Sequence, residues 1–343
     1  MLQFVVPVPY MTTIREVAKL AGVAPITVSR VINKAGYISA ETRQKVEEAV
    51  AQLGYVPNTL SQSLRWKQTG MLALVLTDVT NPFWTTVARG VEDAASNAGY
   101  HVILCNTDES PQKQESYLKA LFEKRVDGLL LVPARDELDD IKQARKLNVP
   151  LVVLDRRLSQ PITDSVRCDS EDGAYQLTRL LLDRGHRQIA LLTGSAHVAT
   201  AVDRLNGYRR AFREASLSEG SEIVFYGAFT LESGLEMAQQ VLERNPRPTA
   251  IFAANNFIAL GVLKSMHAAG LRVPEDISVV GFDDLPTSML IDPVLTVAAQ
   301  PAYEMGAQAT KMLIERLTGN NPEAPQEIVL PVEIVERKSV KAV

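Results

Sequence analysis

Short apolar runs alternate with longer amphipathic segments along most of the chain, and this repeat limits the possible folds more than any other feature. The runs have the length and composition of buried strands, and they are MLALVL, HVILC, DGLLLV, PLVVLD, QIALLT, EIVFYG, TAIFAA and ISVVGF. Repeated strand–helix units predict parallel sheets covered on both faces, because the crossover helices lie over the strands.

The length and internal similarity of this region predict two subdomains. The chain has 343 residues, of which 46% are hydrophobic, and this is too long for one ordinary domain. The second half of the region opens with the same kind of apolar run as the first half. The expected fold class is therefore α/β, with two doubly wound parallel-sheet subdomains.

Composition restricts the class of protein further. Only Cys105 and Cys168 are present, so we expect no disulfide framework and a reducing, cytoplasmic location. No apolar run approaches membrane-spanning length, so no membrane partner is expected. Residues 1–10, MLQFVVPVPY, lack the basic start and cleavage site of a signal peptide. We expect them to be a disordered extension, with Met11 as the natural start.

Charge is unevenly distributed along the chain. Residues 11–68 carry eight basic and four acidic side chains, a net charge of +4, whereas the whole chain carries -4. Residues 1–10 have no charged side chain, so the remainder carries -8. A basic head on an acidic body predicts an anionic partner for the head.

The head contains three short helical patterns. TIRE, at Thr13–Glu16, matches a capping box that begins a first helix, and Gly22 suits its end. Pro25 fits the first turn of a second helix, where its missing N–H costs nothing. Ser39 caps a third helix over 40–53. Three helices with a tight first turn predict a helix-turn-helix.

The second helix has one apolar and one polar side. Val28 and Val31 predict its buried side, and the other side carries hydroxyl, amide and basic groups that suit phosphates. Arg30 can reach a guanine edge or a phosphate. Pro25 and Ile26, at the helix start, can contact only thymine methyl groups. On the residues alone, a solvated face of a small helical bundle is the alternative.

The head also resembles a known family. It carries VAxxAGV, TVSRVIN, ETRxKV and LGYxPN in this order, as do the LacI/GalR transcription regulators. The resemblance implies a DNA-binding domain over 11–57 in a homodimer that binds palindromic operator DNA. Ala24–Ile26 departs from the usual serine and base-reading pair, so the operator sequence is not predicted. The expected DNA contacts in this domain are Thr13, Pro25, Ile26, Thr27, Ser29, Arg30, Asn33 and Tyr37.

A polar segment at 58–69 predicts a hinge. It is too short to form a stable helix alone in water, so we expect coil until it docks. Asn58 can cap a short helix here. The resemblance implies that Leu64 intercalates at a minor-groove base step and that Arg65 lies beside the groove. A plain interdomain linker is the alternative.

The body resembles the periplasmic-binding-protein-like core of the same family. DVTNPFW, VLDRR, DRLNGYRRAF and VPEDISVVGFDD carry this match. It implies an effector-binding and dimerisation core over 70–343, with chain crossovers near 165–172 and near 296–302.

The polar residues after the strands suit a sugar or sugar derivative. Ligands of open α/β sheets bind outside the carboxyl ends of the strands. Carboxylates, amides and guanidinium groups bind hydroxyls, while aromatic faces pack against C–H groups. The resemblance places the effector contacts at Phe83, Trp84, Asp155, Thr200, Arg204, Phe229, Asn255, Asp283 and Gln300.

Several strand-end residues have a structural alternative. Asp283 can cap a helix, and Asp284 is expected mainly to do so. Trp84 can be ordinary core. Asn256 stands where the family usually has Asp, and we expect it to cap the following helix; Asn255 can cap too. The Arg156–Arg157 pair can bind surface acids.

Two other functions are weighed against a regulator. For an enzyme, there is no GxGxxG after a strand, P-loop, HExxH or GxSxG, and the four histidines lack metal-ligand spacing. We therefore expect no catalytic residue, metal or cofactor. A solute-binding protein or sugar sensor without a DNA role shares the body but has no use for the head. The sequence favours a repressor whose operator affinity is set by a small carbohydrate effector.

Overall fold

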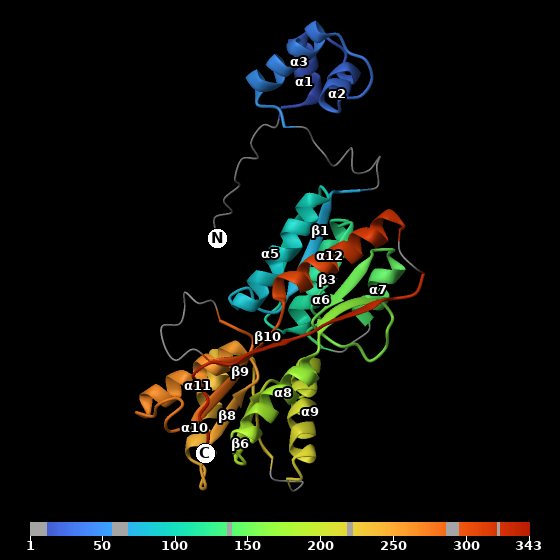
Figure 1. Cartoon of the computed structure of the whole chain (residues 1–343). Helices are drawn as coiled ribbons and strands as arrows, with labels where there is room; N and C mark the ends of the chain where they lie inside the picture. Colours follow the sequence, from blue (N-terminus) through green and yellow to red (C-terminus); the bar gives the residue numbers. More distant parts are fainter. Residues whose placement is uncertain (1–11, 57–67, 136–138, 218–221, 286–294, 321–322) are drawn as a thin grey trace, which may run out of the picture. The chain divides into compact units, whose positions relative to one another are not determined.

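The computed structural model describes residues 12–56, 68–135, 139–217, 222–285, 295–320 and 323–343 (Figure 1). The chain divides into two compact units at Thr69 and Gly70. The predicted extension at 1–10 and most of the predicted hinge lie outside the described residues.

The first unit contains the three predicted helices, α1 (Ile14–Ala21), α2 (Pro25–Ile32) and α3 (Ala40–Leu53). The capping box of α1 is confirmed. The Thr13 backbone N–H donates to Glu16 Oε2 at 2.7 Å, and Thr13 Oγ1 accepts from the Glu16 backbone N–H at 3.4 Å. Fully buried valines from all three helices, Val17, Val28 and Val46, form the centre of a shared core.

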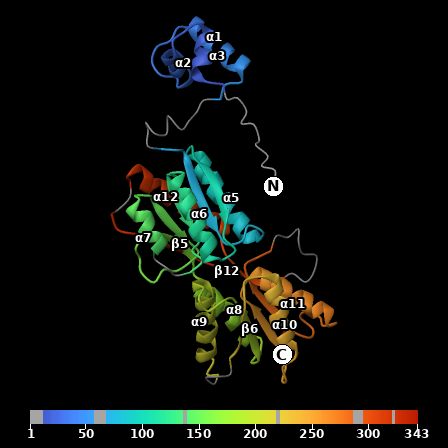
Figure 2. The ribbon, with the colours of Figure 1, turned by 180° about the vertical axis from the view of Figure 1, so that it is seen from behind.

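The second unit consists of two lobes, each built on a six-stranded sheet (Figures 1 and 2). The first lobe has the order β11-β5-β4-β3-β1-β2, and all its pairs are parallel. Its strands are β1 (Met71–Leu76), β2 (His101–Asn106), β3 (Gly128–Leu131), β4 (Leu151–Leu154), β5 (Asp164–Cys168) and β11 (Glu327–Leu330).

The second lobe has the order β12-β10-β9-β8-β6-β7, in which only the β10–β12 pair is antiparallel. Its strands are β6 (Ile189–Thr193), β7 (Ile223–Tyr226), β8 (Ala250–Ala253), β9 (Ser278–Phe282), β10 (Thr296–Ala299) and β12 (Glu333–Val335). The expected fold, with two parallel-sheet subdomains and a helical head, is confirmed.

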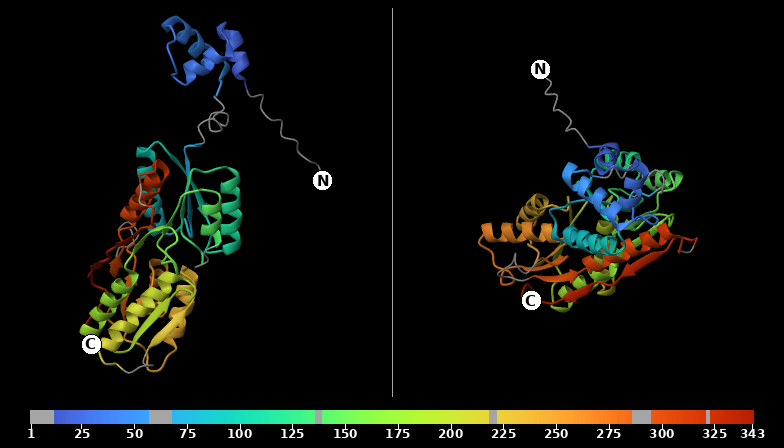
Figure 3. Two further views of the ribbon diagram at one scale, coloured as in Figure 1. Left: turned by 90° about the vertical axis from the view of Figure 1, so that its right-hand side faces the viewer. Right: turned by 90° about the horizontal axis from the view of Figure 1, so that it is seen from above.

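Helices cover both faces of each sheet (Figure 3). In the first lobe, α5 (Pro82–Asn97) and α12 (Ala302–Thr318) cover one face, and α6 (Pro111–Glu123) and α7 (Asp139–Lys146) cover the other. In the second lobe, the pairs are α8 (Ser170–Asp183) with α9 (Ala199–Glu214) and α10 (Leu231–Leu242) with α11 (Asn256–Ala268). None of the helices described is long and apolar enough to cross a membrane.

The alternation of side chains along β1 explains the two layers. Leu72, Leu74 and Leu76 belong to the core beneath α5 and α12, whereas Ala73 and Val75 belong to the core beneath α6 and α7. Successive residues of a strand point to opposite faces, so a strand buried on both sides must be apolar throughout.

The chain passes between the lobes three times: after β5, after β10, and between β11 and β12. The last passage was not predicted from the sequence. It ends in β12, a strand of only three residues that are exposed or half-buried, so no apolar run marks it. These passages bring the carboxyl ends of strands from both sheets to the junction of the lobes.

Helices α5 and α12 approach each other closely because both have glycine at the contact. A Cβ atom on Gly90 would lie 2.1 Å from the Tyr303 carbonyl oxygen, and one on Gly306 would lie 2.1 Å from the Val87 carbonyl oxygen. Both distances are far below van der Waals contact, so the two backbones touch without intervening side chains.

We expect Gly90→Ala to destabilise the protein by about 1–3 kcal/mol, as overpacking of a core does. Alanine normally stabilises a helix by roughly 0.5–1 kcal/mol relative to glycine. A loss of stability on this substitution would therefore indicate a clash between α5 and α12. Urea denaturation of the full chain measures the change, with Ser96→Ala at an exposed position of α5 as the control. A Gly90→Ala protein as stable as the wild type contradicts this packing.

Candidate functional site

The first candidate site is the exposed side of α2 and the turn that follows it. The side chains of Pro25, Ile26 and Arg30 are exposed, with Ile26 at 61%. Tyr37 is 95% exposed. Apolar and basic groups that project freely into solvent from a folded head are suited to contact another molecule.

The remaining predicted DNA contacts are partly engaged within the head. Thr27 and Ser29 are half-buried, and Asn33 Nδ2 donates to Ser29 Oγ at 3.2 Å. Thr13 is exposed at the N-cap of α1. Ala24 gives α2 no side-chain cap, which leaves the first-turn N–H groups without a side-chain acceptor. Three further predicted contacts lie outside the described residues: Asn58, Leu64 and Arg65.

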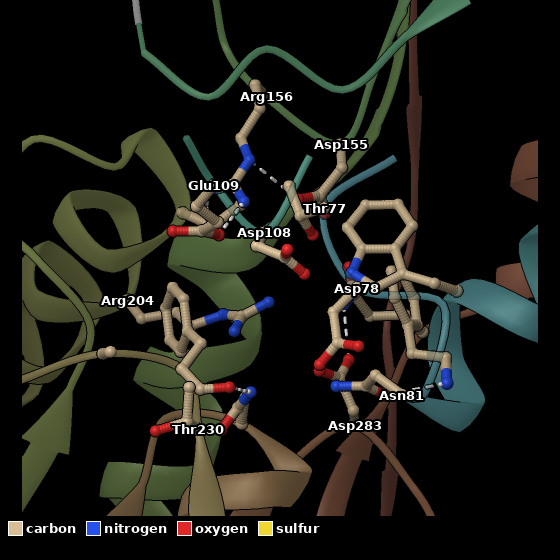
Figure 4. Close-up of a pocket in the computed structure, with 17 residues that line it drawn as sticks. Thr77, Asp78, Asn81, Asp108, Glu109, Asp155, Arg156, Arg204, Thr230 and Asp283 are labelled. Carbon is tan, nitrogen blue, oxygen red and sulfur yellow. Dashed lines mark hydrogen bonds and ion pairs between the residues drawn. The ribbon is translucent and has the colours of Figure 1, made fainter. Parts of the chain in front are cut away.

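The second candidate site is a cavity of about 170 Å³ between the two lobes (Figure 4). The structure brings all nine predicted effector residues to its wall: Phe83, Trp84, Asp155, Thr200, Arg204, Phe229, Asn255, Asp283 and Gln300. Each lies just beyond the carboxyl end of a strand or in the first turns of the following helix. The cavity therefore lies where ligands of open α/β sheets bind.

Arg204 is the central cation of the cavity, and it is 3% exposed. Its guanidinium carbon lies 3.8 Å from the centre of the Phe282 ring, and Nη1 donates to the Ala254 carbonyl oxygen at 2.5 Å. Figure 4 shows the guanidinium pointing toward the middle of the cavity. Among the described atoms, its Nε–H has no hydrogen-bond partner. Burial lowers the pKa of Arg204, while the carboxylates of Asp283 and Asp155 oppose this shift.

Asp155 and Asp283 come from opposite lobes, after β4 and β9, and each is 6% exposed. Burial raises the pKa of both carboxyl groups, and Arg204 acts in the opposite direction on each. Both residues have a left-handed backbone, with φ of 64° and 66°. Such conformations cost energy outside glycine and occur often at functional sites, and here they turn the carboxylates into the cavity.

Gln300 and two aromatic residues complete the predicted set. Gln300 Nε2 donates to Asp283 Oδ1, which leaves Gln300 Oε1 buried and, within the described structure, without a partner. Phe83 and Trp84 lie edge to face, with ring centres 4.8 Å apart. Trp84 contacts the core and also lines the cavity, so its structural role is confirmed and its contact with the effector stays a prediction.

Asn255 has a structural role as well as a place in the cavity wall. It caps α11 by accepting from the Ile258 N–H at 2.8 Å, as the sequence alternative suggested. The expectation that Asn256 is also a cap was wrong. Asn256 lies one position inside the helix, so it is not the cap. Its amide instead exchanges two hydrogen bonds of 2.9 Å with the amide of Asn81 in the other lobe.

One further expectation needs correction and another is not tested. Asp284 was expected mainly as a helix cap, and the residues that it would cap lie outside the described part of the chain; its carboxylate accepts from Arg337 Nη1 at 2.7 Å. Arg156 is not a surface residue: it is 6% exposed, lines the cavity and donates to Glu109 at 2.8 Å. Arg157 does pair with an acid, Asp203, at 2.9 Å.

Part of the cavity wall lies outside the predicted set of effector contacts. The additional lining residues are Thr77, Asp78, Asn81, Asp108, Glu109, Arg156, Ala228 and Thr230. Asp108 and Glu109 follow β2, and the rule that ligands bind beyond strand ends points to them too. Both also have a left-handed backbone, with φ of 51° and 54°, which the sequence does not reveal.

Comparisons with known proteins agree for both units. Residues 13–58 match the model of bacterial regulatory proteins of the lacI family, and residues 69–338 match that of periplasmic binding proteins and the sugar binding domain of the LacI family. The HTH-type transcriptional repressor PurR of Photobacterium profundum is 40% identical over 334 residues, covering 96% of this chain and 99% of that protein.

Two other similar proteins have informative names. The ribose operon repressor of Halalkalibacterium halodurans is 38% identical over 331 residues, covering 96% of this chain and 98% of that protein. The crystal structure of the Lac repressor dimer bound to operator and the anti-inducer ONPF is 30% identical with a TM-score of 0.84, covering 97% and 100% of the two chains. The chain described here belongs to the LacI family of bacterial regulatory proteins.

Proposed function

We propose that this protein is a transcriptional repressor whose affinity for its operator is controlled by a small sugar bound between the two lobes. The observation that carries the proposal is the cavity, which collects polar side chains from both lobes in a chain that also has a helix-turn-helix head. In this proposal, the DNA-binding domain comprises residues 11–57 and the hinge residues 58–69. The core that binds the effector and dimerises comprises residues 70–343.

The chemistry of the cavity wall supports a sugar. Hydroxyl groups can donate to the carboxylates of Asp155 and Asp283 and accept from Arg204, while Phe83 and Trp84 offer apolar surface to C–H groups. The cavity of about 170 Å³ is below the 300–1,000 Å³ of typical ligand pockets. A cavity of this size favours a ligand as small as a monosaccharide. The similarity to a ribose operon repressor makes ribose the first candidate.

A homodimer supports recognition of a palindromic operator, because each half-site then meets an identical head. A DNA-binding role without catalysis accounts for both units. A cytoplasmic location is consistent with binding to operator DNA and with the two free cysteines.

Control by the effector follows from its position. A ligand shifts a conformational equilibrium only by its difference in affinity for the two states. A sugar that contacts both Asp155 and Asp283 distinguishes lobe arrangements, because separating the lobes breaks contacts on one side. The arrangement of the lobes then sets the operator affinity of the heads.

Arg30→Ala should weaken binding to an operator, selected from a random duplex pool, by about 1–3 kcal/mol, the value of a bidentate base contact. Fluorescence anisotropy with operator and scrambled duplexes measures both the loss and the change in specificity. Lys45→Ala is the control, since Lys45 pairs with Glu41 on α3. Unchanged operator affinity of Arg30→Ala would show that α2 does not lie in the groove as proposed.

Arg204→Ala should raise the ribose concentration needed for a half-maximal response by more than about tenfold, because hydrogen bonds to charged groups contribute roughly 1.5–3 kcal/mol. Operator binding without ribose should persist. Titration of ribose into the protein–operator complex measures this, with Arg210→Ala as the control, because the half-buried Arg210 is on α9 but not in the cavity wall. An Arg204→Ala protein that responds at wild-type concentrations places the effector elsewhere.

Asp283→Asn should stabilise the ligand-free protein increasingly as the pH rises. Burial raises the pKa of Asp283, so the folded state favours the protonated carboxyl. This contribution is complete below the unfolded pKa of about 3.9 and is lost as pH rises through the raised folded pKa. Thermal unfolding at acidic and neutral pH should show the variant gaining on the wild type, and a constant difference contradicts this account.

A further inference from the structure

The cavity that the proposed function uses contains more acidic than basic side chains. Its wall includes two guanidinium groups, Arg156 and Arg204, but five carboxylates: Asp78, Asp108, Glu109, Asp155 and Asp283. No lysine or histidine belongs to this set of lining residues. Lys113 pairs with Asp108 at the edge, which leaves four carboxylates and two guanidinium groups in the wall.

Both arginines already interact with acids of the wall. Arg156 donates to Glu109 at 2.8 Å and to Thr200 Oγ1 at 3.1 Å, and its Nε lies 3.4 Å from Asp155 Oδ2. Arg204 donates to a backbone carbonyl and interacts electrostatically with Asp155 and Asp283. A phosphate placed here would compete with these carboxylates for the two guanidinium groups, and charges of one sign repel strongly away from water.

The unsatisfied polar atoms point to the same class of ligand. Within the described structure, the Nε–H groups of Arg156 and Arg204 lack an acceptor, whereas Gln300 Oε1 lacks a donor. A hydroxyl group donates and accepts at once, so neighbouring hydroxyls can satisfy both kinds of atom. A phosphate dianion only accepts, and it would leave the buried Gln300 Oε1 unpaired at a cost in free energy.

We propose that the cavity selects an unphosphorylated sugar and excludes sugar phosphates and sugar acids. The carboxylates of Glu109, Asp155 and Asp283 cause this exclusion. This inference rests on the proposed function, and it names the chemical class of the effector. Glu109 contributes by occupying Arg156, the guanidinium that would otherwise meet an anion.

The test compares the binding of ribose and ribose 5-phosphate to the full-length protein by calorimetry, with methyl riboside as an uncharged ligand that is also larger than ribose. Like charges brought together at a binding site cost several kcal/mol, so ribose 5-phosphate should bind at least about 100-fold more weakly than ribose. Equal affinity for the two ligands overturns the inference.

A charge variant separates repulsion from size. Glu109→Gln keeps the shape of the side chain but releases Arg156, so the ratio of the two dissociation constants should fall by about tenfold or more. If Glu109→Gln leaves the ratio of the dissociation constants for ribose 5-phosphate and ribose unchanged, and methyl riboside also binds weakly, the phosphate is excluded by its size. This result overturns the role of charge. Lys113→Met, at the edge of the cavity, is the opposite control and should leave the ratio unchanged or raise it.

The outcomes also separate this inference from the proposed function. If ribose and a panel of other neutral monosaccharides fail to bind while their phosphates bind, the inference alone is wrong. If neither class binds, the sugar-controlled function is wrong, and the inference falls with it.

Discussion

The burial of the Arg204 guanidinium at the junction of the lobes is the interaction that organises the cavity. A buried charge is stable only when it is paired and hydrogen-bonded. The counter-charges come from Asp155 in the first lobe and Asp283 in the second, and the flat face of Phe282 covers the guanidinium. One side chain thus makes the electrostatics of each lobe depend on the presence of the other.

This arrangement leaves the ligand-free cavity imperfectly satisfied. Carboxylates with raised pKa values, a guanidinium N–H without an acceptor and a buried amide oxygen without a donor all surround the same small space. Each of these groups costs free energy in the ligand-free protein, and the hydroxyls of a ligand can recover it by forming the missing hydrogen bonds. The cavity is therefore complementary to a hydroxylated ligand. Stability and ligand affinity are therefore opposed at Asp283.

The layers of the fold could be predicted because each buried strand is a continuous apolar run. The nine predicted cavity residues could be found because strand ends and family motifs mark them. The role of Asn256 could not be predicted, since a cap and a contact with the other lobe use the same side-chain atoms, and only the position of Asn81 decides between them. The strand-end rule can locate Glu109, but its pairing with Arg156 could not be predicted, because the two residues are distant in sequence.

The three passages of the chain between the lobes have a mechanical consequence. β11 lies beside β5, β12 lies beside β10, and the short segment between β11 and β12 joins these neighbours. Neighbouring chain segments that cross a boundary together resist stretching and sliding much more than they resist a small twist shared by all of them. The lobes are thus joined along one edge, and we expect their relative motion to be mainly a rotation that widens or narrows the opposite edge.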